Sequence, residues 1–111
     1  MIQAITTKDE WGDILKQSDI KTVIVYKHSS TCSISREVLG RLEKGIADGR
    51  ITDPIYMLIV QDSRELSEAI AEDIGLQHES PQMILIKEGQ VLYSASHYDI
   101  TVDDMIEYIH Q

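Results

Sequence analysis

Apolar residues in this chain fall into two patterns: short continuous runs, and stripes that recur every three or four positions. The runs are rich in β-branched residues and predict β-strands. The predicted strands are residues 2–5, 22–27, 55–60, 83–87 and 90–93. The second and third runs are unbroken, which is typical of interior strands covered on both faces. The last two flank Glu88-Gly89, a two-residue connection that predicts a β-hairpin.

The stripes between these runs have the spacing of helix faces and predict four helices. The helices are expected to begin after Thr7, after Cys32, after Asp62 or Ser63, and after Thr101. Thr7 and Glu10 have the spacing of a capping box, in which each side chain bonds the backbone N–H of the other residue. Gly75 is a fitting end for the third helix. Gly45 and Gly49 are expected to mark the weakening end of the second.

The resulting order is β-α-β-α-β-α-β-β-α, which predicts one α/β domain over residues 1–111. We expect a central mixed sheet of four to five strands with helices on both faces. Ligands on such sheets tend to lie beyond the carboxyl ends of the parallel strands, where Cys32 falls. The hairpin strand that starts at Met83 should run the opposite way. The segment 79–82 before it should therefore lie at the same end of the sheet as Cys32.

Composition and charge narrow the class of protein. The chain has 111 residues, 42% of them hydrophobic, which is enough for one core. Its net charge of −9 argues against non-specific nucleic-acid binding, which needs clustered lysines and arginines, and solubility is the simpler explanation of the acidity. The sequence has no apolar run of membrane-spanning length and no basic stretch leading into an apolar core at its start. We therefore expect a cytoplasmic protein that does not bind membranes.

The clearest candidate for chemistry is Cys32, the only cysteine. A single cysteine excludes an intramolecular disulfide and a metal site of several thiolates, and we expect no metal. At a strand-to-helix junction the sulfur faces unpaired N–H groups and the positive end of the helix dipole. Both favour the thiolate, so a reactive thiol is expected rather than a buried inert one. Lys27, His28 and Arg36 add positive charge close by in the sequence.

The residues around the thiol have two interpretations each. Ser35, where a dithiol enzyme would carry its second cysteine, could donate to the thiolate or satisfy a first-turn backbone group. Thr31 could contact a ligand through its backbone, but a helix cap is the favoured interpretation. His28 could favour the thiolate through its charge, although a solvated loop histidine is the simpler interpretation. Pro81 is either an ordinary strand-entry proline or part of a tight turn that exposes the backbone of Ser80 to a ligand.

Three segments carry a resemblance to a known family. They are His28-Ser29-Ser30-Thr31-Cys32-Ser33-Ile34-Ser35, Glu79-Ser80-Pro81-Gln82 and Ser96-His97-Tyr98-Asp99-Ile100-Thr101. With the order of elements, they resemble the thioredoxin superfamily and, more narrowly, the monothiol bacilliredoxins of bacillithiol-producing bacteria. The resemblance spans nearly the whole chain; the T-C-x-I-S motif is fairly specific and the other two segments are supportive. That family often has proline directly after the cysteine, whereas Ser33 lacks the preset backbone and keeps an N–H and a hydroxyl.

This resemblance implies a thioredoxin-like fold and a monothiol thiol-disulfide oxidoreductase that removes bacillithiol from mixed disulfides on proteins. Cys32 would attack the bacillithiol sulfur and become bacillithiolated, and an external low-molecular-weight thiol would regenerate it. Bacillithiol would be a co-substrate, with no permanently bound cofactor, and bacillithiolated proteins would be the partners of a monomer. His97 precedes the last helix, whose free N–H groups could hold a carboxylate of the malyl group of bacillithiol.

Other cysteine chemistries fit the spacing less well. A cysteine phosphatase needs arginine six residues after its cysteine, where this chain has Val38. An arsenate-reductase-like enzyme needs several basic groups, and only Arg36 is close in sequence. The ligand spacing of a zinc site is absent. The remaining alternative is a non-catalytic thioredoxin-like interaction module or a thiol redox sensor; a thiol pKa near that of free cysteine would favour an inert module.

Overall fold

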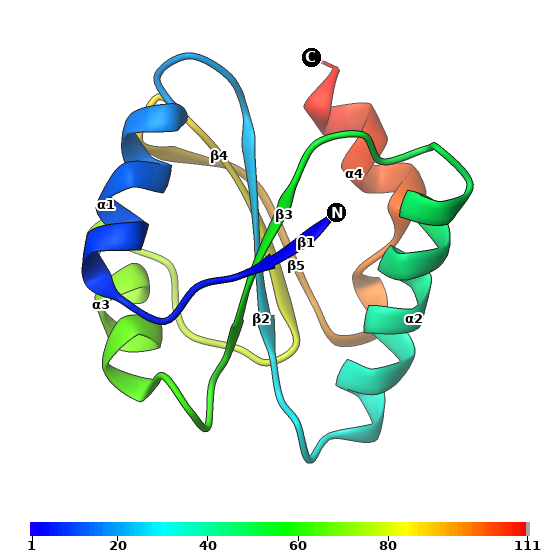
Figure 1. Ribbon diagram of the computed structural model, residues 1–111, viewed down its shortest axis with the longest axis horizontal. Coiled ribbons are helices and arrows are strands. Elements are labelled where there is room, and N and C mark those ends of the chain that lie inside the picture. The colour runs from blue at the N-terminus through cyan, green and yellow to red at the C-terminus, as the bar shows by residue number, and fades with distance from the viewer. Residues whose placement is uncertain (111) are drawn as a thin grey trace.

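The structure, a computed structural model, describes residues 1–110 and consists of a five-stranded sheet between two layers of helices (Figure 1). The strands are β1 (Ile2–Ala4), β2 (Val23–His28), β3 (Ile55–Ile59), β4 (Gln82–Lys87) and β5 (Gln90–Ser96). They are ordered β1-β3-β2-β4-β5, with β1, β3 and β2 parallel and with β4 antiparallel to both β2 and β5. The mixed sheet predicted from the sequence is confirmed.

Two helices cover each face of this sheet. The helices are α1 (Lys8–Gln17), α2 (Ser33–Ala47), α3 (Arg64–Ile74) and α4 (Val102–Ile109). Figure 1 shows α1 and α3 on one face, and α2 and α4 on the other. Thr7 and Glu10 form the predicted capping box of α1, and Gly75 ends α3 in the left-handed conformation. A short 3-10 helix, η1 (His97–Asp99), was not predicted and leads from β5 towards α4.

Gly45 and Gly49 lie on either side of the end of α2 at Ala47, as predicted. Gly45 is also buried, which the sequence did not show. A Cβ atom at this position would lie 2.9 Å from Ile51 Cδ1 and 3.1 Å from Val102 Cγ2. The missing side chain therefore lets the first residue of α4 pack directly on α2. Gly49 follows the helix end with a left-handed φ of 74°, as terminating glycines do.

Each pair of helices closes its own apolar cluster against the sheet. Ile24 and Tyr26 of β2 belong to the cluster under α2 and α4, whereas Val23 belongs to the cluster under α1 and α3. Successive side chains of a strand point to opposite faces, so β2 contributes to both clusters. In the second cluster the only tryptophan, Trp11, is 2% exposed, and its Nε1–H donates to Asp73 Oδ2 at 2.8 Å. This bond ties α1 to α3.

The pairing of β2 with β4 brings the two predicted site segments together. Lys27, near the end of β2, pairs with Gln82, the first residue of β4, in antiparallel register. The residues after β2 and those before β4 therefore meet at one end of the sheet. The prediction that Cys32 and the segment 79–82 share an end of the sheet is confirmed.

Lys27 is fully buried on the face covered by α1 and α3, which the sequence did not reveal. Its Nζ donates to the backbone oxygen of Ser67 in α3 at 3.1 Å and lies 3.2 Å from His78 Nδ1. Over residues 1–110, no carboxylate pairs with this ammonium group. Burial lowers the pKa of Lys27 to about 8. Lys27 is thus an interior lysine and not part of an exposed basic patch beside the cysteine.

We predict that Lys27 makes the stability of the fold rise with pH above neutrality. The unfolded chain keeps the ordinary lysine pKa of 10.5, whereas the folded chain has one of about 8. Between these values the unfolded chain binds the extra proton, so the free energy of unfolding increases as the pH rises through this range. Lys27→Met should lack this gain. Urea unfolding of the wild type and the variant from about pH 7 to about pH 10 measures the free energy of unfolding at each pH. The same pH dependence in both proteins would contradict the prediction.

Candidate active site

Cys32 lies at the predicted junction, as the N-cap residue of α2, whose exposed first residue is Ser33. The Cys32 side chain is partly exposed, and its backbone N–H donates to Ser29 O at 3.4 Å. The thiol makes no cap hydrogen bond of regular geometry, but nearby donors favour its thiolate. The backbone N–H of Ser35 lowers the pKa of the Cys32 thiol most, desolvation opposes it, and Ile34 N–H and the Ser35 hydroxyl lower it further. A lowered pKa increases the reactive fraction at neutral pH.

Ser35 is fully buried in the first turn of α2, and its side chain bonds the loop before the helix rather than a first-turn backbone group. Its Oγ accepts a hydrogen bond from the backbone N–H of Ser29 at 3.2 Å, which holds the loop between β2 and α2 closed. Its hydroxyl proton is left for the sulfur of Cys32, and this bond contributes to the lowered thiol pKa. The Ser35 hydroxyl thus occupies the position at which a dithiol enzyme has its second sulfur, and it stabilises the thiolate of Cys32.

Tyr26 and His28 form a support behind Ser35. The Tyr26 O–H donates to Ser35 O at 3.1 Å, and His28 Nδ1 lies 3.2 Å from the Tyr26 oxygen. Because a carbonyl can only accept, the phenol proton belongs to Ser35 O and His28 Nδ1 donates to the phenol oxygen. Burial lowers the pKa of His28, although the charge of Glu43 opposes this, so the ring is neutral at neutral pH. His28 is a half-buried strand residue, neither a solvated loop histidine nor a source of positive charge for Cys32.

Gln61, just after β3, holds the cysteine loop from the other side. Its Nε2 donates to Ser29 Oγ at 2.7 Å and to Thr31 Oγ1 at 3.2 Å. Its Oε1 accepts from the backbone N–H of Ser30 at 3.1 Å. The favoured interpretation of Thr31 as the helix cap is wrong, because Cys32 occupies that position. Sequence reasoning missed Gln61, whose only signal was its place beyond the carboxyl end of a parallel strand.

The turn before β4 lies beside the cysteine loop. Its Ser80–Pro81 peptide bond is cis, and Pro81 is buried. Pro81 O accepts from the backbone N–H of His97 at 3.0 Å, which anchors the turn to the residue after β5. Within residues 1–110, the backbone N–H and C=O of Ser80 make no hydrogen bond, and this residue is partly exposed. Of the two interpretations of Pro81, a tight turn that exposes the Ser80 backbone is the one that fits.

His97 lies at the rim of this region, where it begins η1 with a left-handed φ of 55°. Its Nε2 lies 3.4 Å from Glu79 Oε2, so an acidic side chain already accompanies it. The predicted use of the free N–H groups of α4 to hold a carboxylate is not supported. Thr101 Oγ1 already accepts from Asp104 N–H at 3.2 Å, and Asp103 and Asp104 in the first turn would repel an anion.

Two further findings concern metals and membranes. In the part of the chain that the structure describes, no group of three or more His, Cys, Asp or Glu side chains could hold a metal ion. Over the same residues, none of the helices combines the length and the apolar character needed to span a bilayer.

The sheet order and the cysteine at the β2–α2 junction define a thioredoxin-like protein, and solved structures agree. One described as an oxidoreductase candidate with a thioredoxin fold matches with a TM-score of 0.84 and 29% identity, over 96% of this chain and 92% of that chain. Reduced thioredoxin from Schistosoma mansoni matches with a TM-score of 0.73 and 16% identity, over 97% of each chain. Thioredoxin from Fasciola hepatica matches with a TM-score of 0.72 and 13% identity, over 97% of this chain and 96% of that chain. The thioredoxin-like fold predicted from the sequence is confirmed.

A family model places the chain in a narrower group than the thioredoxin-like fold does. The family model of the monothiol bacilliredoxin BrxC matches residues 3–105, and the chain belongs to this family. The resemblance seen in the cysteine motif is therefore confirmed. Membership supports a thiol redox function, and Cys32 is the only thiol in the chain through which such a function could act.

We predict that Ser35→Ala raises the pKa of the Cys32 thiol, because the variant loses a hydroxyl that stabilises the thiolate. It should also cost about 1–3 kcal/mol of unfolding free energy, since the buried Ser29 N–H loses its acceptor. Ser33→Ala is the matched control, because Ser33 lies in the same turn and is exposed. The pH dependence of iodoacetamide alkylation measures the thiol pKa. Identical titrations for the wild type and both variants would contradict the prediction.

Proposed function

We propose that this chain is a monothiol thiol-disulfide oxidoreductase that removes bacillithiol from protein mixed disulfides. The observation that carries the proposal is the environment of Cys32, a lone and partly exposed thiol whose pKa is lowered by the first turn of α2. Family membership supports bacillithiol as the low-molecular-weight thiol. In this proposal bacillithiol is a co-substrate, bacillithiolated proteins and a regenerating thiol are the partners, and the protein works as a cytoplasmic monomer.

The reaction is a thiol–disulfide exchange in two steps. The Cys32 thiolate attacks the bacillithiol sulfur, the S–S bond of the mixed disulfide breaks, and the substrate protein leaves as a thiolate that takes a proton from water. Cys32 is then joined to bacillithiol through a new S–S bond. An external thiolate attacks the bacillithiol sulfur of this adduct and releases the Cys32 thiolate. Ser35 cannot take this second role because it carries no sulfur.

The surroundings of the sulfur position the substrate in this proposal. The unpaired backbone N–H and C=O of Ser80, next to Pro81, can bond an extended chain that lies over Cys32. Ser35 stabilises the attacking thiolate, and the neutral ring of His28 keeps the turn behind it in place. The residues that we assign to the edge of the substrate are Thr31, Ser33 and His97.

A thiol redox sensor is the second candidate, because an isolated thiolate without a resolving cysteine also retains an adduct. A sensor would take up bacillithiol from a small disulfide but would not release the thiol of a bacillithiolated protein. A non-catalytic interaction module has no need of the lowered thiol pKa of Cys32.

We predict that the wild type removes bacillithiol from a bacillithiolated model protein and gains the mass of one bacillithiol. Cys32→Ala should show neither change, because the only sulfur nucleophile is gone. Intact-mass spectrometry of both proteins follows donor and acceptor in one reaction. Retained removal in Cys32→Ala overturns the proposed mechanism. Uptake from oxidised bacillithiol without removal from the model protein favours the sensor.

A second prediction concerns the missing resolving thiol. Ser35→Cys places a sulfur where the Ser35 hydroxyl now contacts Cys32. Its thiolate should attack the Cys32 sulfur of the adduct, form a disulfide with Cys32 and expel bacillithiol as a thiolate. The adduct should therefore decay without added thiol in Ser35→Cys and persist in the wild type, as followed by intact mass over time. An equally persistent adduct in both proteins would contradict the prediction, because a thiol at position 35 would then not release bacillithiol from Cys32.

A further inference from the structure

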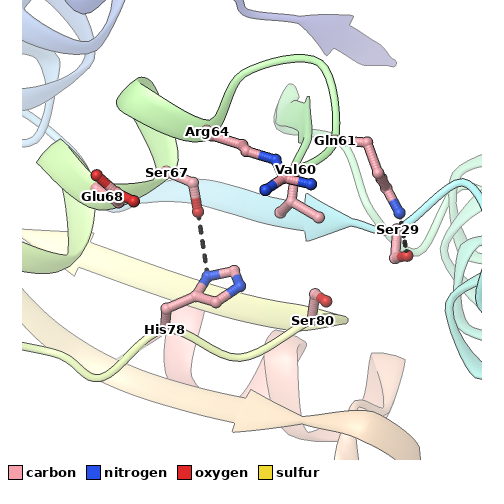
Figure 2. Close-up of a pocket in the computed structure, with 8 residues that line it drawn as sticks. All are labelled: Ser29, Val60, Gln61, Arg64, Ser67, Glu68, His78 and Ser80. Carbon is pink, nitrogen blue, oxygen red and sulfur yellow. Dashed lines mark hydrogen bonds between the residues drawn. The ribbon is translucent and has the colours of Figure 1, made fainter.

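A hollow of about 460 Å³ lies between α3 and the segment that leads into Pro81 (Figure 2). Its volume falls within the range of roughly 300–1,000 Å³ that is usual for small-molecule sites. Its polar lining includes Ser29, Gln61, Arg64, Ser67, His78 and Ser80. Apart from Ser80, the proposed reaction assigns no role to the residues that line this hollow.

The hollow adjoins the candidate active site. Ser29 belongs to both, because it lines the hollow and its backbone oxygen accepts from Cys32 N–H. Ser80 lines the wall that lies across from α3, as Figure 2 shows, and it directly precedes Pro81. Gln61 bonds to Ser29 and fixes the edge between the hollow and the cysteine loop. The hollow therefore adjoins the loop that carries Cys32.

Arg64 gives the hollow a cation without a partner. Among residues 1–110, the Arg64 guanidinium forms no ion pair and no hydrogen bond. Figure 2 shows its side chain reaching over the hollow towards Val60 and away from Glu68. Glu68 is the single acidic residue in the lining. A guanidinium with all its donors free is suited to a carboxylate, which it can bind with two parallel hydrogen bonds.

The floor of the hollow carries a second positive charge and an oriented donor. Lys27 Nζ lies beneath the lining and donates to Ser67 O and His78 Nδ1. Its third N–H has no acceptor among residues 1–110. An ammonium group can only donate, so His78 Nδ1 is an acceptor and the ring proton is on Nε2. Figure 2 shows this second ring nitrogen on the side of the ring that faces Ser80, farther along the same segment. The hollow thus combines two cationic groups, Arg64 and Lys27, with one carboxylate in its lining, Glu68, and a second close to His78, Glu79.

We propose that this hollow is a subsite for the carboxylate of a low-molecular-weight thiol whose sulfur is joined to Cys32. Arg64 binds the carboxylate directly, His78 Nε2–H donates to it, and Lys27 contributes charge from below. Identification of that thiol as bacillithiol, through its malyl carboxylates, rests on the function proposed above. The preference of the hollow for a carboxylate does not rest on that function, because it follows from the side chains of the hollow itself.

Two small disulfides test the subsite without a substrate protein. Dithiodipropionate carries carboxylates, 2-hydroxyethyl disulfide carries none, and both can form an adduct on Cys32. Rates of adduct formation on the full chain are measured by intact mass for the wild type, Arg64→Gln and Arg36→Gln. Arg36 is the matched control, since it is exposed in the first turn of α2, close to the thiol, and does not line the hollow. Circular dichroism checks that each variant is folded.

We expect Arg64→Gln to slow the reaction with dithiodipropionate about tenfold and to leave the neutral disulfide unchanged. Arg36→Gln should change the ratio of the two rates little. An unchanged ratio in Arg64→Gln, an equal fall in both variants, or an equal loss with both disulfides overturns the subsite.

Oxidised bacillithiol separates this proposal from the function. If the wild type forms no adduct with it while Arg64 still selects dithiodipropionate, the subsite stands and the bacillithiol function fails. If bacillithiol is removed from proteins but Arg64→Gln and Arg36→Gln behave alike, the function stands and the subsite fails.

Discussion

The antiparallel pairing of β2 with β4 is the constraint on which the rest of the molecule depends. The pairing of Lys27 with Gln82 brings the carboxyl end of β2 to the start of β4, and so places the cysteine loop beside the turn at Pro81. A slip of one residue would also send every side chain of β2 to the wrong layer. The hydrogen-bonded ladder thus determines both the two apolar clusters and the geometry around the thiol.

The alternation of β2 gives two adjacent residues unrelated tasks. Tyr26 points under α2, where its hydroxyl supports the carbonyl of Ser35 in the turn that surrounds the sulfur. Lys27 points under α3, where it bonds Ser67 and His78 beneath the hollow. Burying an ammonium group is costly unless its donors are satisfied, and here two neutral acceptors replace a carboxylate. The strand therefore links the thiol environment to its neighbouring hollow through one stretch of backbone.

Much of the fold was readable from local patterns, because capping and turn signals act within a few residues. Glu88 and Gly89 both have positive φ, as the predicted two-residue hairpin turn requires. The thiol, its serine neighbour and the proline turn were found the same way. The hollow was not, because Gln61, Arg64 and His78 are brought to the cysteine loop by pairing across the sheet. Periodicity also cannot show that a lysine ending an apolar run remains inside.

The bond from the Trp11 indole to Asp73 has a consequence for spectroscopy. Trp11 is the only tryptophan, and it is buried between α1 and α3, in the layer on the other side of the sheet from α2. Its fluorescence therefore reports the integrity of that layer, and the indole is not part of the thiol environment. Emission from this single ring offers an optical measure of folding that is independent of the oxidation state of the sulfur.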